Sequence, residues 1–97
     1  MRHFYRSHLP PADVLVVADQ FFAALGLSPA ATTSRTRQLA GPLGAMKLSV
    51  RPEGGHYTFV EVTTDQMGES RLDRNVKKFF LQVHRAEDPS HTLQAAY

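Results

Sequence analysis

Residues 56–64 carry the strongest strand signal of the chain and constrain its fold more than any other stretch. Seven of the nine residues are β-branched or aromatic, which is typical of a β-strand. Side chains alternate between the two faces of a strand, so Tyr57 and Phe59 point to one side and Val60 and Val62 to the other. Both faces are therefore apolar. We expect a central strand that needs cover on both sides, from helices on one face and from a partner on the other.

Two segments have the apolar periodicity of helices that cover a sheet. The first is expected over residues 11–25, with Gly26 as a left-handed stop after its last turn. The second is expected over about 69–86, where Ser70 and Asp73 have the spacing of a capping pair. Its buried stripe is expected to consist of Leu72, Val76, Phe79 and Val83.

Three further strands are predicted, at residues 1–9, 32–39 and 45–51. Tyr and Phe favour extension in the first, Thr in the second, and alternating apolar residues in the third. Proline and glycine pairs separate these segments, as they do at turns. With residues 56–64, the expected order is β-α-β-β-β-α.

This order predicts an α+β fold, a four-stranded antiparallel sheet with both helices packed on one face. The length suits a single domain. We expect that domain to span residues 1–88, followed by a flexible or partner-docking tail over residues 89–97.

The hairpin turn at residues 52–55 decides which face of the next strand is buried, because a slip of one residue flips every side chain. An even-numbered loop would place Tyr57, Phe59 and Glu61 beneath the helices. A three-residue loop would pair Val50 with Thr58 and bring the valines there instead. We favour the even loop, because it buries the two aromatic side chains.

Composition and motifs narrow the possible chemistry. The chain has no cysteine, which excludes disulfides, thiolate catalysis and cysteine-ligated metals. No histidine pair has metal-binding spacing on a helix, and no nucleophile elbow, P-loop or dinucleotide motif is present. We therefore expect no metal and no cofactor, and favour a non-catalytic domain over an enzyme. The first residues lack a secretory apolar run, and no stretch suits a membrane span, so we expect a cytoplasmic protein without a membrane partner.

The favoured function is a homodimer formed through the open sheet face, because exposed apolar side chains on a sheet make an adhesive patch. In the favoured register, Val60 and Val62 form that interface. The residues on the other face, Tyr57, Phe59 and Glu61, could contact a small apolar ligand held between sheet and helices.

Two alternatives have support in the sequence. A nucleic-acid module would use basic strand residues beside an aromatic, as β-sheet RNA platforms do. Its candidates are Arg35, Arg37, Lys47 and Arg51, with Arg2 and Arg6 on a neighbouring strand. It ranks lower because the net charge is only +2. The second alternative is an acid–base enzyme, in which burial would raise the pKa of Glu61.

The expected layout is similar to a trimmed helix-grip domain or to one half of a TATA-binding protein. This resemblance is one of topology and implies no site residues. Double-stranded-RNA-binding domains also have α-β-β-β-α order, but Gly68-Glu69-Ser70 stands here where that family has a glycine-lysine-lysine entry to its last helix.

Overall fold

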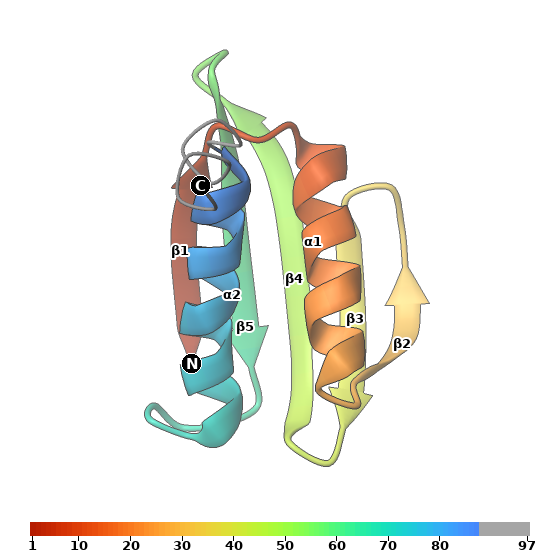
Figure 1. Cartoon of the computed structure of the whole chain (residues 1–97). Helices are drawn as coiled ribbons and strands as arrows, with labels where there is room; N and C mark the ends of the chain where they lie inside the picture. The colour runs from red at the N-terminus through yellow and green to blue at the C-terminus, as the bar shows by residue number, and fades with distance from the viewer. Residues whose placement is uncertain (88–97) are drawn as a thin grey trace, which may run out of the picture.

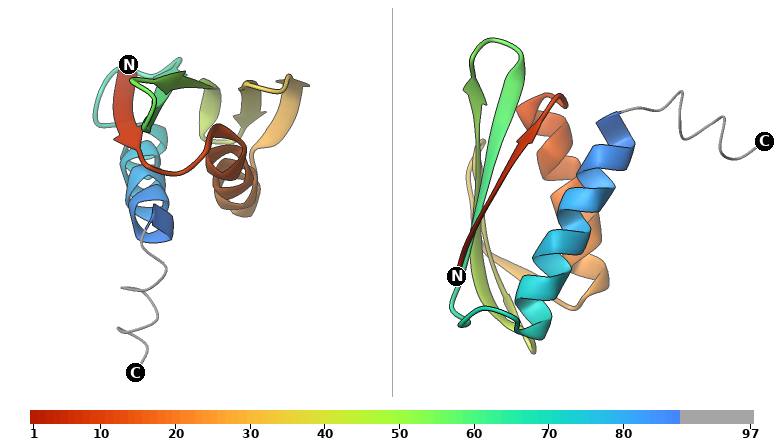
Figure 2. Two further views of the ribbon diagram at one scale, coloured as in Figure 1. Left: turned by 90° about the horizontal axis from the view of Figure 1, so that it is seen from above. Right: turned by 90° about the vertical axis from the view of Figure 1, so that its left-hand side faces the viewer.

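The computed structural model describes residues 1–87 as two layers, an antiparallel sheet and two helices packed on one of its faces (Figure 1). The elements are β1 (Arg2–Ser7), α1 (Pro11–Ala24), β2 (Ser28–Thr32), β3 (Thr36–Gly41), β4 (Gly44–Glu53), β5 (Tyr57–Thr64) and α2 (Arg71–Glu87). The strand order is β1-β5-β4-β3-β2. Helix α2 lies over β1 and β5, and α1 lies over β4 and β3. No element within residues 1–87 covers the opposite face, which we call the open face (Figure 2).

The predicted α+β class and antiparallel sheet are confirmed, but the sheet has five strands rather than four. The strand predicted at 32–39 corresponds to β3, and an additional strand, β2, precedes it. The two are joined by a turn in which the Thr33 hydroxyl accepts the amides of Arg35 and Thr36. Strand β2 was missed because Pro29 and its alanine neighbours have low strand propensity. It forms an edge of the sheet, where proline is tolerated. The predicted tail, residues 89–97, lies outside the described residues.

The register favoured for the β4–β5 hairpin is wrong. Glu53 pairs with Tyr57, so the loop holds three residues, and Gly54 and Gly55 supply its positive φ angles of 64° and 77°. The three-residue alternative gives the observed face, although Val50 lies opposite Val60 rather than Thr58. Odd-numbered side chains of β5 consequently point to the open face.

The core fills the space between the helices and the sheet. Phe22 of α1 and Phe79 of α2 are fully buried, with ring centroids 5.1 Å apart. The predicted stripe of α2 is confirmed, since all four of its members are fully buried. Val60 and Val62 complete this layer from the sheet side. Burying each such side chain contributes about 1.5–3 kcal/mol, so this layer is the main source of stability.

The hairpin between β3 and β4 requires glycine at position 44. Gly44 has φ +129°, and a Cβ atom there would lie 2.6 Å from Gln66 Nε2 and 2.7 Å from Asp65 Oδ1. The same Asp65 oxygen accepts the Ala45 amide at 3.1 Å. Close approach at Gly44 thus lets the connection after β5 bind the start of β4.

Candidate functional site

The open face brings aromatic rings and guanidinium groups together on strands β1, β5 and β4. Phe59 of β5 lies opposite Arg6 of β1 on one side and Arg51 of β4 on the other. Both guanidinium carbons lie over the Phe59 ring, at 5.2 Å for Arg6 and 4.4 Å for Arg51. The Phe4 ring adds a contact at 5.4 Å. These neighbours leave Phe59 only 7% exposed, although no helix covers it.

Two further aromatic rings on this face remain open to solvent. Phe4 is 51% exposed and Tyr57 is 44% exposed. The guanidinium of Arg2 lies 4.9 Å from the centroid of the Phe4 ring, and the His8 ring lies 4.8 Å from that of Tyr57. Two exposed rings therefore flank the buried Phe59: Phe4, beside the Arg2 guanidinium, and Tyr57, beside the His8 imidazole.

We call these residues and one lysine the open-face cluster. Its members are Arg2, Phe4, Arg6, His8, Lys47, Arg51, Tyr57 and Phe59. Lys47 belongs to it because it lies four residues before Arg51 on the same face of β4, opposite Thr63.

The electrostatic balance of the open face is positive. Glu61 accepts from the Arg2 guanidinium, and Glu53 Oε1 accepts from Arg6 Nε at 2.6 Å. Within residues 1–87, no carboxylate forms an ion pair with Lys47 or Arg51. Four cations against two carboxylates leave the face with a local charge of +2, which favours anionic ligands.

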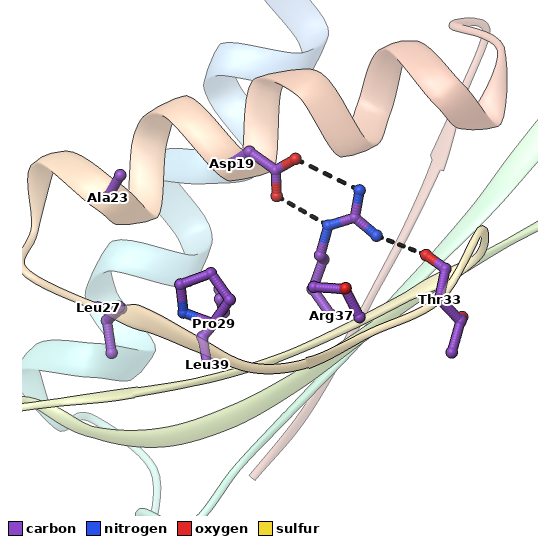
Figure 3. Close-up of a pocket in the computed structure, with 8 residues that line it drawn as sticks. Asp19, Ala23, Leu27, Pro29, Thr33, Arg37 and Leu39 are labelled. Atoms are coloured by element: carbon purple, nitrogen blue, oxygen red, sulfur yellow. Dashed lines mark hydrogen bonds and ion pairs between the residues drawn. The ribbon is translucent and has the colours of Figure 1, made fainter.

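The structure separates the four cations of the nucleic-acid hypothesis. Lys47 and Arg51 point to the open face, whereas Arg37 points to the helix side and binds Asp19 of α1, with 2.9 Å between Nε and Oδ1 (Figure 3). Arg37 also donates to the Thr33 carbonyl. Arg37 therefore does not share a face with Lys47 and Arg51. Arg35 lies in the turn between β2 and β3.

Arg37 lines a hollow between α1 and the β2–β3 edge (Figure 3). The hollow measures about 290 Å³, and apolar side chains such as Leu27 and Leu39 form its floor. Arg37 donates four hydrogen bonds, to the Asp19 carboxylate and to the backbone carbonyls of Thr33 and Thr36. Arg37 therefore clamps the β2–β3 turn to α1.

The other predicted site residues also exchange faces. Val60 and Val62 are fully buried beneath the helices, so their predicted place on the open face is wrong. Tyr57, Phe59 and Glu61 face away from the helices, contrary to the favoured register. The Glu61 side chain binds only Arg2 within residues 1–87, and no histidine or tyrosine hydroxyl contacts it.

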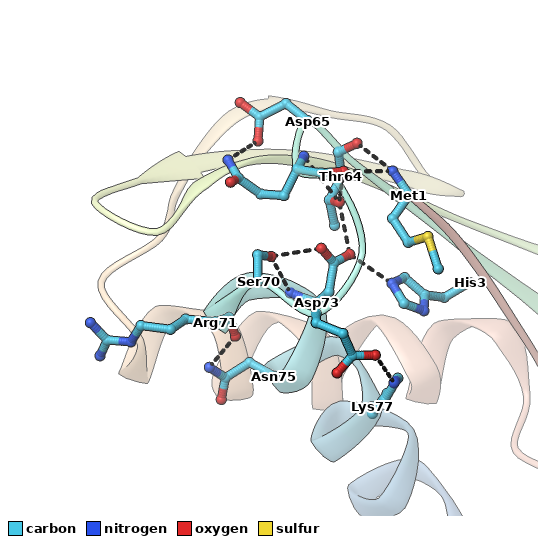
Figure 4. Close-up of polar contacts among 11 residues, drawn as sticks. Met1, His3, Thr64, Asp65, Ser70, Arg71, Asp73, Asn75 and Lys77 are labelled. Atoms are coloured by element: carbon cyan, nitrogen blue, oxygen red, sulfur yellow. Dashed lines mark hydrogen bonds and ion pairs between the residues drawn. The ribbon is translucent and has the colours of Figure 1, made fainter.

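A buried polar network around Asp73 joins β1, β5 and the start of α2 (Figure 4). Asp73 is 1% exposed and accepts from Ser70 Oγ at 2.6 Å, His3 Nε2 at 2.8 Å and Thr64 Oγ1 at 2.9 Å. The Asp73 amide donates to Ser70 Oγ, which confirms the predicted capping pair. Burial raises the pKa of Asp73, but the three hydrogen bonds outweigh burial and hold it below its usual value. The network has a structural role, because every member is buried or bound within it.

A second polar cluster lies on the helix side, where β1 meets the end of α2. The Tyr5 hydroxyl donates to Glu87 Oε1 and contacts His84 Nδ1, both at 3.2 Å. Burial and the Glu87 carboxylate raise the pKa of Tyr5 to about 12. The Tyr5 phenol is therefore neutral at physiological pH and acts as a donor.

Comparisons with known proteins give no match from which a function could be inferred, so the geometry of the open face is the basis for the function proposed below. The sequence matches no protein-family model, and none of the curated proteins gives a match. In the part of the chain that the structure describes, no three histidine or acidic side chains converge as metal ligands. Neither α1 nor α2 is long and apolar enough to cross a membrane.

The site contains residues that the sequence hypotheses left without a role. Phe4 and His8 belong to the open-face cluster, yet only Arg2 and Arg6 of β1 were considered as binding residues. The signal that could have found them is the alternation along β1, where residues 2, 4, 6 and 8 share one face.

Proposed function

We propose that the protein binds single-stranded nucleic acid across the open face of its sheet. The observation that carries this proposal is the Phe59 ring held between Arg6 and Arg51, with Phe4 and Tyr57 exposed on either side. Proteins that bind single strands combine cations that follow the backbone with aromatic rings on which bases stack. The open-face cluster supplies both on one surface.

The spacing of the exposed rings suits more than one base. Phe4 lies opposite Glu61, which is four residues from Tyr57 along β5. At a rise of about 3.3 Å per residue, the two ring positions are separated by roughly 13 Å along the strand. A stacked strand advances by about 3.4 Å per nucleotide, so each ring can take a different base. A paired duplex cannot present its bases to these rings, which favours a single strand.

The open face supports nucleic acid better than it supports a second copy of the chain. The valines predicted for the homodimer interface lie in the core, and the Phe4 and Phe59 rings on the open face lie beside guanidinium groups. Two copies packed through this face would bring two positive surfaces together, which costs free energy. Phosphates would instead neutralise the same cations. The homodimer stays a prediction, and the test below distinguishes it.

The test compares two variants, Phe4→Ala and Leu81→Ala. Both remove a large apolar side chain of similar exposure, 51% and 56%, and Leu81 lies on α2 in the opposite layer. Binding of a short labelled oligothymidine is followed by fluorescence anisotropy. Near 200 mM salt, contacts made only to phosphates are weak, so stacking dominates. Phe4→Ala should lose one stacked base, about 1–3 kcal/mol or roughly 5- to 150-fold in Kd. Leu81→Ala should bind like the wild type.

Two results would overturn the proposal. One is equal affinity for the two variants. The other is a wild-type dimer, seen by native mass spectrometry, that becomes a monomer in Phe4→Ala while neither form binds the oligonucleotide. That second result would assign the open face to self-association.

A further inference from the structure

The solvent face of α2 carries a row of cations that the open face does not use. Arg71, Arg74 and Lys78 recur at intervals of three and four residues, which places them along one side of the helix. All three are exposed. We call these residues the helix stripe.

The helix stripe is not neutralised by carboxylates within residues 1–87. Glu69 lies close to Lys77, at 3.4 Å between Oε1 and Nζ, and the Asp73 carboxylate is buried in its own network. Within residues 1–87, no carboxylate forms an ion pair with Arg71, Arg74 or Lys78. Long unpaired cations on one side of a rigid helix create a local positive potential that attracts an anionic partner.

The helix stripe and the open-face cluster belong to opposite layers of the molecule. Figure 2 shows the sheet as one layer and α2 as part of the other, with the open face turned away from the helices. The shortest extent of the chain is 21 Å. A short strand stacked on Phe4 and Tyr57 would have to pass around an edge of the sheet to reach α2. One short strand therefore occupies one layer at a time.

We propose that the helix stripe binds the phosphate backbone of a second nucleic-acid segment, so that one domain holds two segments on opposite sides. This inference rests on the function proposed above. Arg71 and Lys78 are seven residues apart, which is about 10 Å along the helix, and a single strand offers one phosphate per about 3.4 Å. Three cations over that length match a run of phosphates. The stripe contains no aromatic ring, so this contact is independent of base sequence.

The experiment measures bridging between two oligonucleotides. Two oligothymidines that cannot pair, one with a donor dye and one with an acceptor dye, are mixed with the full chain at low salt. Energy transfer between the dyes is expected, and native mass spectrometry should show one protein with two oligonucleotides.

Two matched charge reversals separate the layers. Arg74→Glu with Lys78→Glu alters the helix stripe, and Lys47→Glu with Arg51→Glu alters the open-face cluster. Each double variant replaces exposed cations, and circular dichroism checks the fold. Each should retain one bound oligonucleotide and lose energy transfer.

The outcomes distinguish this inference from the proposed function. If the helix-stripe variant still holds two oligonucleotides with unchanged energy transfer, the stripe is not a site. A second result also rules out the stripe as a nucleic-acid site. In that result the wild type binds phosphatidylserine vesicles and the helix-stripe variant does not, while both bind oligonucleotides equally, which would assign the stripe to lipid. A complex of two proteins with two oligonucleotides would also overturn bridging by one domain. If the open-face variant behaves like the wild type while the helix-stripe variant loses all binding, the proposed function fails instead.

Discussion

Removing the Asp73 carboxylate should cost the protein a large part of its stability. Asp73 accepts hydrogen bonds from three side chains, and two of these, His3 and Thr64, are buried with it. In Asp73→Ala the buried donors lose their acceptor, and α2 loses the carboxylate in its first turn. The cost comes chiefly from leaving polar groups buried without partners, rather than from losing attractive contacts.

The magnitude follows from these groups. Each buried donor left unsatisfied costs about 1–3 kcal/mol, and losing a carboxylate from the first turn of a helix costs about 0.3–1 kcal/mol. With two buried donors left without an acceptor, we expect a total of about 3–5 kcal/mol, the middle of the range to which these costs add. Domains of this size are stable by about 5–15 kcal/mol, so a fifth or more of the stability is at stake.

Urea unfolding followed by circular dichroism measures the loss. With a slope of about 1.5 kcal/mol per molar urea, the midpoint should fall by about 2–3 M. The matched control is Glu69→Ala, because that carboxylate is 80% exposed and should change stability by less than about 0.5 kcal/mol. If Asp73→Ala does not fold, Thr64→Val removes a single donor and should cost about 1 kcal/mol.

The same network predicts a pH dependence. The pKa of Asp73 is lower in the folded protein than the usual value near 3.9, so the unfolded chain binds its proton more readily. Its stabilising contribution is complete above about pH 5 and is lost as pH falls through the folded pKa. The gap between wild type and Asp73→Ala should therefore shrink in acid. Equal midpoints for Asp73→Ala and Glu69→Ala, or a gap that widens in acid, would refute this reasoning.

Three further predictions concern other parts of the molecule. Gly44→Ala should lower stability by more than Gly54→Ala, because a Cβ at Gly44 would lie 2.6 Å and 2.7 Å from two side-chain atoms, whereas a Cβ at Gly54 meets no atom. At Gly54 only about 1 kcal/mol of backbone strain applies, and the urea midpoints of the two variants measure the difference. Glu61→Gln should free the guanidinium of Arg2 for a phosphate and tighten oligonucleotide binding at low salt by about 2- to 5-fold; weaker binding would contradict the assigned role. The phenol of Tyr5 should titrate near pH 12 in the folded protein, which ultraviolet titration of the wild type and of Tyr5→Phe measures directly. The contribution of Tyr5 to stability should therefore be complete below about pH 10 and be lost as the pH rises towards 12.

The sequence predicted the elements well where local signals are strong. Both helices begin within two residues of their predicted starts, because Pro11 and Ser70 mark first turns whatever surrounds them. Gly26 ends the α1 segment with φ +83°, as a left-handed stop requires. Strand β2 was not predicted, because this exposed edge strand of small residues has no alternation of apolar and polar side chains.

The face of β5 could not be predicted from local signals. Its two apolar faces satisfy either register, and the choice rests on whether the loop after Glu53 holds an even or odd number of residues. The consecutive glycines Gly54 and Gly55 are compatible with either loop length, because glycine adopts positive φ angles readily. Because the binding residues follow the register, Phe59 and Val60 exchanged roles between prediction and structure. Arg37 was misplaced for a related reason, since its contact with Asp19 depends on tertiary packing.

The most direct test of the account is an NMR titration of the isotope-labelled full chain with a short single-stranded oligonucleotide. The account predicts that the largest amide shifts fall on strands β1, β5 and β4, around Phe4, Arg51 and Tyr57, and that they diminish as salt is raised. A smaller set on α2 should appear at low salt only. The account is contradicted if the oligonucleotide leaves the amides of these three strands unchanged.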